Sequence, residues 1–111
     1  MKYRSFLAAS AFCLSFGNIA HASALCTESI VNVILHTNGN IYFMTDKTCS
    51  GNWCQLNLKA GDVPTNKNAY AMLLMAKAMS KPINFQWDTV TDCTQQNPVY
   101  ASPAFMVFTD G

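Results

Sequence analysis

Charged residues are scarce in this chain, and their scarcity excludes several classes of protein. Lys, Arg, Asp and Glu make up 12% of the 111 residues, while 50% are hydrophobic. An intrinsically disordered chain has the opposite balance, so we expect a packed core. The formal net charge of +1 lacks the basic excess that binding to nucleic-acid phosphates requires. We therefore expect one compact domain that binds neither DNA nor RNA.

Arginine is almost absent as well. Arg4 is the only one, and residues 25–111 contain none. Its guanidinium group is the side chain best suited to two-point recognition of phosphate and carboxylate groups. The composition therefore disfavours a strongly anionic ligand.

No apolar run in the sequence is long enough to span a bilayer. A basic start at residues 2–4 precedes an apolar run at 6–16, and small residues of the kind that signal peptidase accepts follow at 20–24. This order is typical of a secretory signal peptide, since a membrane span needs about 20 apolar residues. We expect a signal peptide over 1–24 and a single secreted or periplasmic domain over 25–111, with no membrane span.

No Cys-x-x-Cys pair of the kind that binds zinc occurs in the chain. Residues 25–111 contain an even set of cysteines: Cys26, Cys49, Cys54 and Cys93. An even count in a small exported domain predicts two disulfides rather than a metal site. In the hairpin expected below, Cys49 comes within one diagonal step of Cys26, so the register allows Cys26 to pair with Cys49 and Cys54 with Cys93. Other pairings stay open.

Groups suited to catalysis are few. His36 is the only histidine of residues 25–111, and no Gly-x-Ser-x-Gly motif accompanies it. Asp88 and Asp92 offer a carboxylate pair of the glycosidase kind, but two acids in a loop are usually just solvated. We therefore expect a protein that is not an enzyme and that needs no cofactor or metal.

Three strands are expected in the first half of the domain. Two runs of β-branched and aromatic residues, 30–36 and 41–45, flank the turn dipeptide Asn38-Gly39, which predicts a β-hairpin. A third strand is expected over 53–58, in which Cys54 and Trp53 point to opposite faces.

One helix is expected over 68–79, with Thr65 or Asn66 as its N-cap. It is apolar nearly all the way round, so we expect it to be buried in a core or an interface. Its methionines are better explained by packing than by copper binding.

Two further strands are expected after the helix. Residues 83–88 alternate strictly between apolar and polar, which indicates one buried face, whereas the uniformly apolar run 103–108 should be covered on both faces. The order β-β-β-α-β-β predicts an OB-like five-stranded Greek-key barrel. A flat three-plus-two sheet packed on the helix is the alternative.

Four segments of the sequence resemble those of a known family. They are 36–39 (His-Thr-Asn-Gly), 41–43 (Ile-Tyr-Phe), 70–76 (Tyr-Ala-Met-Leu-Leu-Met-Ala) and 81–85 (Lys-Pro-Ile-Asn-Phe). The chain resembles the cell-binding B subunits of subtilase-cytotoxin-like and typhoid-toxin-like bacterial toxins and their stand-alone secreted relatives. The resemblance implies an OB-fold that assembles into a pentameric ring and binds sialylated or related host-cell glycans, without catalytic activity of its own.

The resemblance also implies positions for a glycan pocket. Trp87 matches the family's aromatic position at the end of the fourth strand, where its ring would stack on a sugar. The alternative is that Trp87 is a core residue. Ser29 lies one residue from the family's serine position, which Glu28 occupies in register.

The residues themselves suggest further ligand contacts. Trp53 is a candidate for an exposed aromatic side chain, and Asn84 and Gln86 carry amides suited to sugar hydroxyls, although such amides often only solvate a surface. The sequence thus predicts a secreted, non-catalytic, homo-oligomeric binding module whose partner is a host-cell glycan or protein surface, and which can accompany a catalytic toxin subunit. A monomeric periplasmic interaction or inhibitor protein is the alternative.

Overall fold

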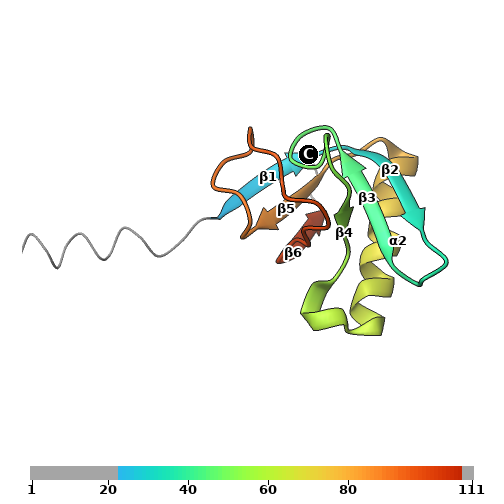
Figure 1. Cartoon of the computed structure of the whole chain (residues 1–111). Coiled ribbons are helices and arrows are strands. Elements are labelled where there is room, and N and C mark those ends of the chain that lie inside the picture. The colour runs from blue at the N-terminus through green and yellow to red at the C-terminus, as the bar shows by residue number, and fades with distance from the viewer. Residues whose placement is uncertain (1–22, 109–111) are drawn as a thin grey trace, which may run out of the picture.

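The computed structural model describes residues 23–108 (Figure 1). The expected signal peptide lies outside the described residues, except for its last two positions. The described elements are β1 (Ala24–Glu28), β2 (Ile30–Leu35), β3 (Ile41–Thr45), β4 (Cys54–Gln55), the 3-10 helix η1 (Leu58–Gly61), α2 (Val63–Met79), β5 (Ile83–Trp87) and β6 (Phe105–Phe108). Within these residues, no helix has the length and apolarity to cross a bilayer.

The strands form two antiparallel three-stranded sheets, β1-β5-β6 and β2-β3-β4. Only Ser29 separates β1 from β2, so this one stretch of chain leaves the first sheet and enters the second (Figure 1). A mainly β protein with one α-helix is therefore confirmed. The described strands do not close into a barrel, and there are six of them instead of the five expected, because β1 precedes the first strand that the sequence pattern predicted.

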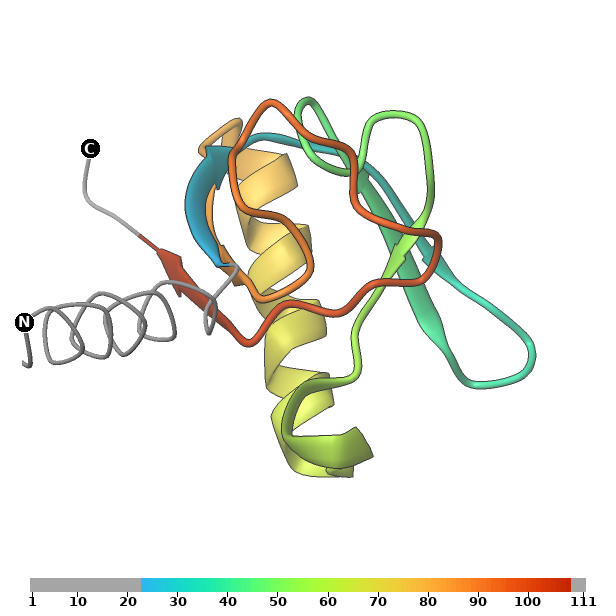
Figure 2. The same cartoon turned by 60° about the vertical axis from the view of Figure 1, so that its left-hand side comes forward.

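A long connection brings the two sheets together on the side away from α2. Figure 2 shows the segment between β5 and β6 crossing to the neighbourhood of β4 and returning to β6. There the backbone N–H of Gln55 donates to the carbonyl of Ala101 at 2.9 Å, and the N–H of Tyr100 donates to the carbonyl of Trp53 at 2.7 Å. These bonds connect β4 to the segment that leads into β6.

The hairpin of β2 and β3 forms as predicted, but its register differs by one residue. Val33 pairs with Phe43 and Leu35 with Ile41. The turn is longer than Asn38-Gly39 alone, because the N–H of His36 donates to the carbonyl of Asn40 at 2.9 Å and encloses three residues. Gly39 takes a φ of 88° there, a conformation that favours glycine.

Helix α2 begins at Val63, five residues before the expected start. Asp62 is its N-cap in place of Thr65 or Asn66, and its carboxylate accepts a hydrogen bond from the N–H of Thr65 at 3.1 Å. Pro64 stands in the first turn, where proline is well tolerated because the first N–H groups have no partner within the helix. Pro64 therefore belongs to the first turn of α2 and precedes the expected helix start.

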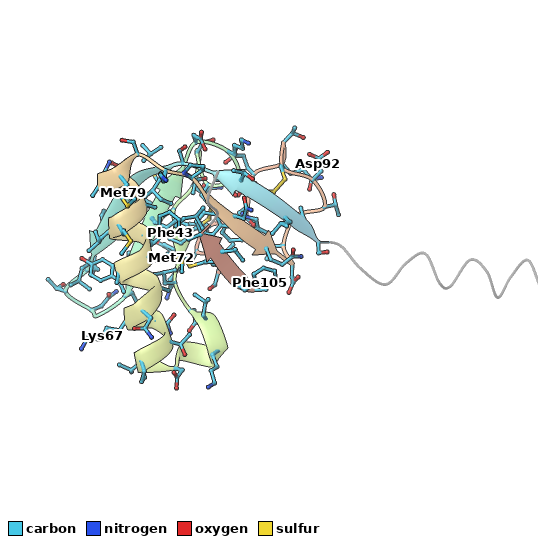
Figure 3. All side chains as sticks on the ribbon, turned by 180° about the vertical axis from the view of Figure 1, so that it is seen from behind. Phe43, Lys67, Met72, Met79, Asp92 and Phe105 are labelled. Carbon is cyan, nitrogen blue, oxygen red and sulfur yellow. A yellow bond between two sulfur atoms is a disulfide. The ribbon has the colours of Figure 1, made fainter. Side chains whose placement is uncertain are left out.

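Only one side of α2 is buried. Ala69, Leu73 and Ala76 pack into the core, whereas Leu74, Met75 and Met79 are exposed. Figure 3 looks onto α2, with Met79 near one end of the helix and Phe43 beside its middle. The core behind the helix is built on the stacked rings of Phe43, Phe85 and Trp87, whose adjacent centroids are 5.5 Å apart.

Two of the expected strands differ from the structure. Strand β4 is limited to Cys54–Gln55 because the chain turns into η1, with Lys59 at a positive φ of 49°. Strand β6 was expected to be covered on both faces, but Phe105 and Val107 are 46% and 42% exposed. It is an edge strand of the β1-β5-β6 sheet.

The four cysteines form two disulfides, as predicted, but in a different pairing. Cys26 bonds with Cys93 and Cys49 with Cys54, over Cα–Cα distances of 5.5 and 5.9 Å. The expected pairing was wrong because it placed Cys26 on an extension of the hairpin. Cys26 instead belongs to β1, which pairs with β5 and leaves Cys49 to its near neighbour. Two disulfides agree with a secreted or periplasmic protein.

Candidate functional site: an aromatic hollow

The side chain of Trp87 is completely buried. Its indole N–H donates to Oε2 of Glu28 at 2.8 Å, and its ring stacks on Phe85. The indole face therefore cannot receive a sugar ring, and the core role is the correct one. The strict alternation of β5 carries this information, since Trp87 shares its face with Ile83 and Phe85.

Asn84 and Gln86 lie on the outer face of the β1-β5-β6 sheet, half-buried. Asn84 faces Thr27 on β1, whose hydroxyl donates to its side-chain carbonyl. Gln86 is paired with Leu25 on one side and Phe105 on the other. Neither Asn84 nor Gln86 lines the two hollows described next, which contain Ser29 and Trp53. The structure therefore does not bring these predicted site residues together.

Ser29 is exposed at the junction of β1 and β2, and its N–H donates to Oδ1 of Asp46 at 2.9 Å. It borders a polar hollow of about 230 Å³, called the serine hollow, which Ser29 forms with Ile30, Ala76, Lys77, Ser80 and Lys81. The neighbouring Glu28 points away from this hollow into the core, where Thr48 and Trp87 bind its carboxylate.

Trp53 belongs to a different hollow, on the outer side of the β2-β3-β4 sheet. This hollow has a volume of about 340 Å³ and is lined by Ile34, His36, Asn38, Tyr42, Trp53 and Tyr100. We call it the aromatic hollow. Trp53 is half-buried and so is less accessible than the exposed aromatic side chain that was expected, whereas Tyr100 is 54% exposed. The other lining residues were not recognised as site residues from the sequence.

Three separate segments position the rings of the aromatic hollow. Tyr42 projects from β3 on the face opposite to the buried Phe43. Trp53 directly precedes β4, in the short loop that the Cys49–Cys54 disulfide closes. The rings of Tyr42 and Tyr100 are tilted at 46° with centroids 5.2 Å apart.

The backbone of Tyr100 adopts a strained conformation. Its φ is 65°, in the left-handed region that costs a residue with a side chain about 1–2 kcal/mol. The hydrogen bond from its N–H to the carbonyl of Trp53 holds this conformation beside the hollow. Strain of this kind at an exposed aromatic residue is typical of a functional site.

The polar groups of the hollow are held by their neighbours. The Tyr42 hydroxyl accepts hydrogen bonds from the side-chain amides of Asn40 at 3.1 Å and Asn38 at 3.3 Å. These two bonds, that of Asn40 first, lower the pKa of Tyr42 below its usual value because they stabilise the phenolate. Nδ1 of His36 accepts from the N–H of Asn38 at 3.2 Å, so in the neutral imidazole the proton lies on Nε2.

A larger hollow of the described surface has fewer aromatic side chains in its walls than the aromatic hollow has. This larger hollow, of about 380 Å³, lies between the hairpin and the start of α2, with Leu35, Ile41, Leu56 and Val63 among its walls, and Tyr70 is its one aromatic residue. No group of three or more His, Cys, Asp or Glu within residues 23–108 is placed to hold a metal ion. The aromatic hollow combines three aromatic side chains with polar groups that neighbouring residues orient.

Comparisons with known proteins found no family model that matches the chain, and no match among the curated proteins or the solved structures.

Proposed function

We propose that the protein is a secreted, non-catalytic binding module that recognises a glycan in the aromatic hollow. The observation that carries the proposal is the convergence of Tyr42, Trp53 and Tyr100, from three separate segments, on one accessible hollow. Tyr100 has a left-handed backbone there, which the hydrogen bond from its N–H to Trp53 holds, and its side chain is exposed.

A sugar fits these groups better than other small ligands do. The apolar C–H face of a pyranose stacks on an aromatic ring, while its hydroxyl groups need hydrogen-bond partners at the rim. The tyrosine hydroxyl and the imidazole N–H supply such partners, and both are already oriented by Asn38. Preorganised groups lose little conformational entropy on binding.

The arrangement of the strands supports a fold like that of the toxin B subunits. The continuous stretch of β1 and β2 belongs to both sheets and corresponds to the first strand of a five-stranded OB-fold. In that count β4 is the third strand and β5 the fourth, and α2 lies between them. The hydrogen bonds of Gln55 and Tyr100 join the sheets on the remaining side. We propose an incompletely closed OB-like barrel on these grounds.

Assembly into a ring is part of the same proposal. The exposed apolar residues Leu74, Met75 and Met79 on α2, with Phe105 and Val107 on β6, give the surface that subunits would bury. Light scattering of the processed, oxidised protein should give about five times the mass of one chain. A monomer would contradict the ring and favour the alternative of a periplasmic interaction or inhibitor protein.

The glycan site is tested by Trp53→Ala on a glycan array. We expect the wild type to bind one group of glycans and the variant to lose that binding. The control is Val63→Ala, which shortens an exposed apolar side chain at the start of α2, outside both the aromatic hollow and the proposed subunit contact, and should leave binding unchanged. Equal binding by the wild type and Trp53→Ala would refute the assignment of this hollow.

A further inference from the structure

We infer that the aromatic hollow selects a neutral pyranose and discriminates against a sialylated one. This inference rests on the proposed function and adds the class of sugar. Its first support is charge, because none of the six lining residues is acidic, lysine or arginine. Of the described lysines, Lys77 and Lys81 border the serine hollow instead.

The hydrogen bonds of the Tyr42 hydroxyl further restrict which ligand groups can bind to it. A phenolic oxygen has two acceptor positions, and the amides of Asn38 and Asn40 occupy them. The remaining capacity of this hydroxyl is its own proton, so it can only donate to a ligand. The ligand must therefore bring an oxygen acceptor to this position.

Two more donors lie in the hollow. With Nδ1 of His36 engaged by the backbone of Asn38, the free nitrogen Nε2 carries the proton of the neutral ring. Trp53, which also lines the hollow, has an indole N–H that can only donate. A sugar hydroxyl or ring oxygen satisfies such donors directly.

Charge decides between neutral and anionic acceptors. Moving a carboxylate from water into a hollow walled by aromatic rings costs solvation free energy. Hydrogen bonds from neutral donors recover only part of this cost. No lysine or arginine lines the hollow to offset this loss, whereas a hydroxyl or ring oxygen carries no such penalty. Neutral sugars are therefore favoured here, while Lys77 and Lys81 lie at the separate serine hollow.

The test uses an N-glycan series that ends in mannose, N-acetylglucosamine, galactose or sialic acid, titrated into the processed, oxidised protein by calorimetry. Trp53→Ala identifies the binding that belongs to the aromatic hollow, and the double variant Lys77→Ala/Lys81→Ala removes the charges of the serine hollow. We expect Trp53-dependent binding of at least one neutral end, with the sialylated glycan about tenfold weaker than its galactose-terminated match.

The outcomes separate the two proposals. Trp53-dependent binding that is as tight or tighter for the sialylated glycan would overturn the neutral preference and leave glycan binding standing. No Trp53-dependent binding to any member of the series would overturn both.

The donor role of Tyr42 has its own variant. Tyr42→Phe keeps the ring and removes the hydroxyl, and we expect about a tenfold loss of affinity for the neutral glycan. The control is Tyr70→Phe, which removes the hydroxyl of the tyrosine in the larger hollow, outside the aromatic hollow, so binding should stay within about twofold of the wild type. Equal affinities of Tyr42→Phe and the wild type would contradict the donor role.

Discussion

Glu28 is the residue at which the two sheets are joined through side chains. It lies on β1 and is 1% exposed. Its carboxylate accepts from the hydroxyl of Thr45 on β3, from the N–H and hydroxyl of Thr48, and from the indole of Trp87 on β5. An ionised carboxylate only accepts hydrogen bonds, and each of these neighbours donates at least one.

Glu28→Gln should therefore destabilise the protein by about 1–3 kcal/mol, because its new NH₂ group must face either the N–H of Thr48 or the indole N–H of Trp87. Urea unfolding at pH 7 measures the effect. Asp88→Asn, at an exposed position just after β5, is the matched control and should leave the midpoint unchanged. The same midpoint for Glu28→Gln and wild type would contradict this account.

Tyr100 allows backbone strain to be separated from ring contacts. Both Tyr100→Gly and Tyr100→Ala lose the ring that packs on Tyr42, but only glycine adopts a φ of 65° freely. The glycine variant should be more stable than the alanine variant by about 1 kcal/mol. Thermal unfolding of the pair measures this difference, and both variants should lose glycan binding. A more stable alanine variant would show that the conformation is not strained.

The stability of α2 depends on the ionisation of its N-cap residue, Asp62. The hydroxyl and the N–H of Thr65, in that order, donate to Asp62 and lower its pKa below the ordinary 3.8. Because the folded state favours the ionised form, the cap stabilises the protein above this value, and its contribution is lost as the pH falls through the lowered pKa.

Asp62→Ala should accordingly lower the unfolding midpoint at pH 7, with a smaller difference from wild type when the pH is brought below about 4. Circular dichroism during thermal unfolding at a series of pH values gives both quantities. Asp88→Ala, which removes an exposed acid outside any helix, serves as the control. A difference that grows toward low pH would contradict the stabilising role of the ionised cap.

At the scale of the whole molecule, the two disulfides have different effects. Cys26–Cys93 spans 67 residues and ties β1 to the long connection, whereas Cys49–Cys54 spans 5 and closes the loop that holds Trp53. In the chain-entropy model the longer loop contributes about 4 kcal/mol and the shorter about 2 kcal/mol.

Replacing each pair by alanines should therefore separate stability from binding. Cys26→Ala/Cys93→Ala should lose more stability in urea, while Cys49→Ala/Cys54→Ala should lose more glycan affinity because Trp53 is no longer held. The reverse order in both measurements would contradict these assignments.

The sequence by itself determined the local features of this protein. The hairpin, the helix over 68–79, the alternation of residues 83–88 and the use of four cysteines in disulfides all depend on residues close in the chain or on a simple count. The alternation near Cys54 likewise placed Trp53 on the face opposite to that buried cysteine, although Trp53 is half-buried and not exposed as expected.

Only the tertiary structure decided which distant segments meet. It buried Trp87 on Glu28, paired Cys26 with Cys93, and brought Tyr100 against Tyr42 and Trp53. No local period or turn signal contains these contacts, because they depend on the path of the long connection between β5 and β6. That path is set by packing and backbone hydrogen bonds between residues far apart in sequence, so the candidate site exists only once the two sheets have come together.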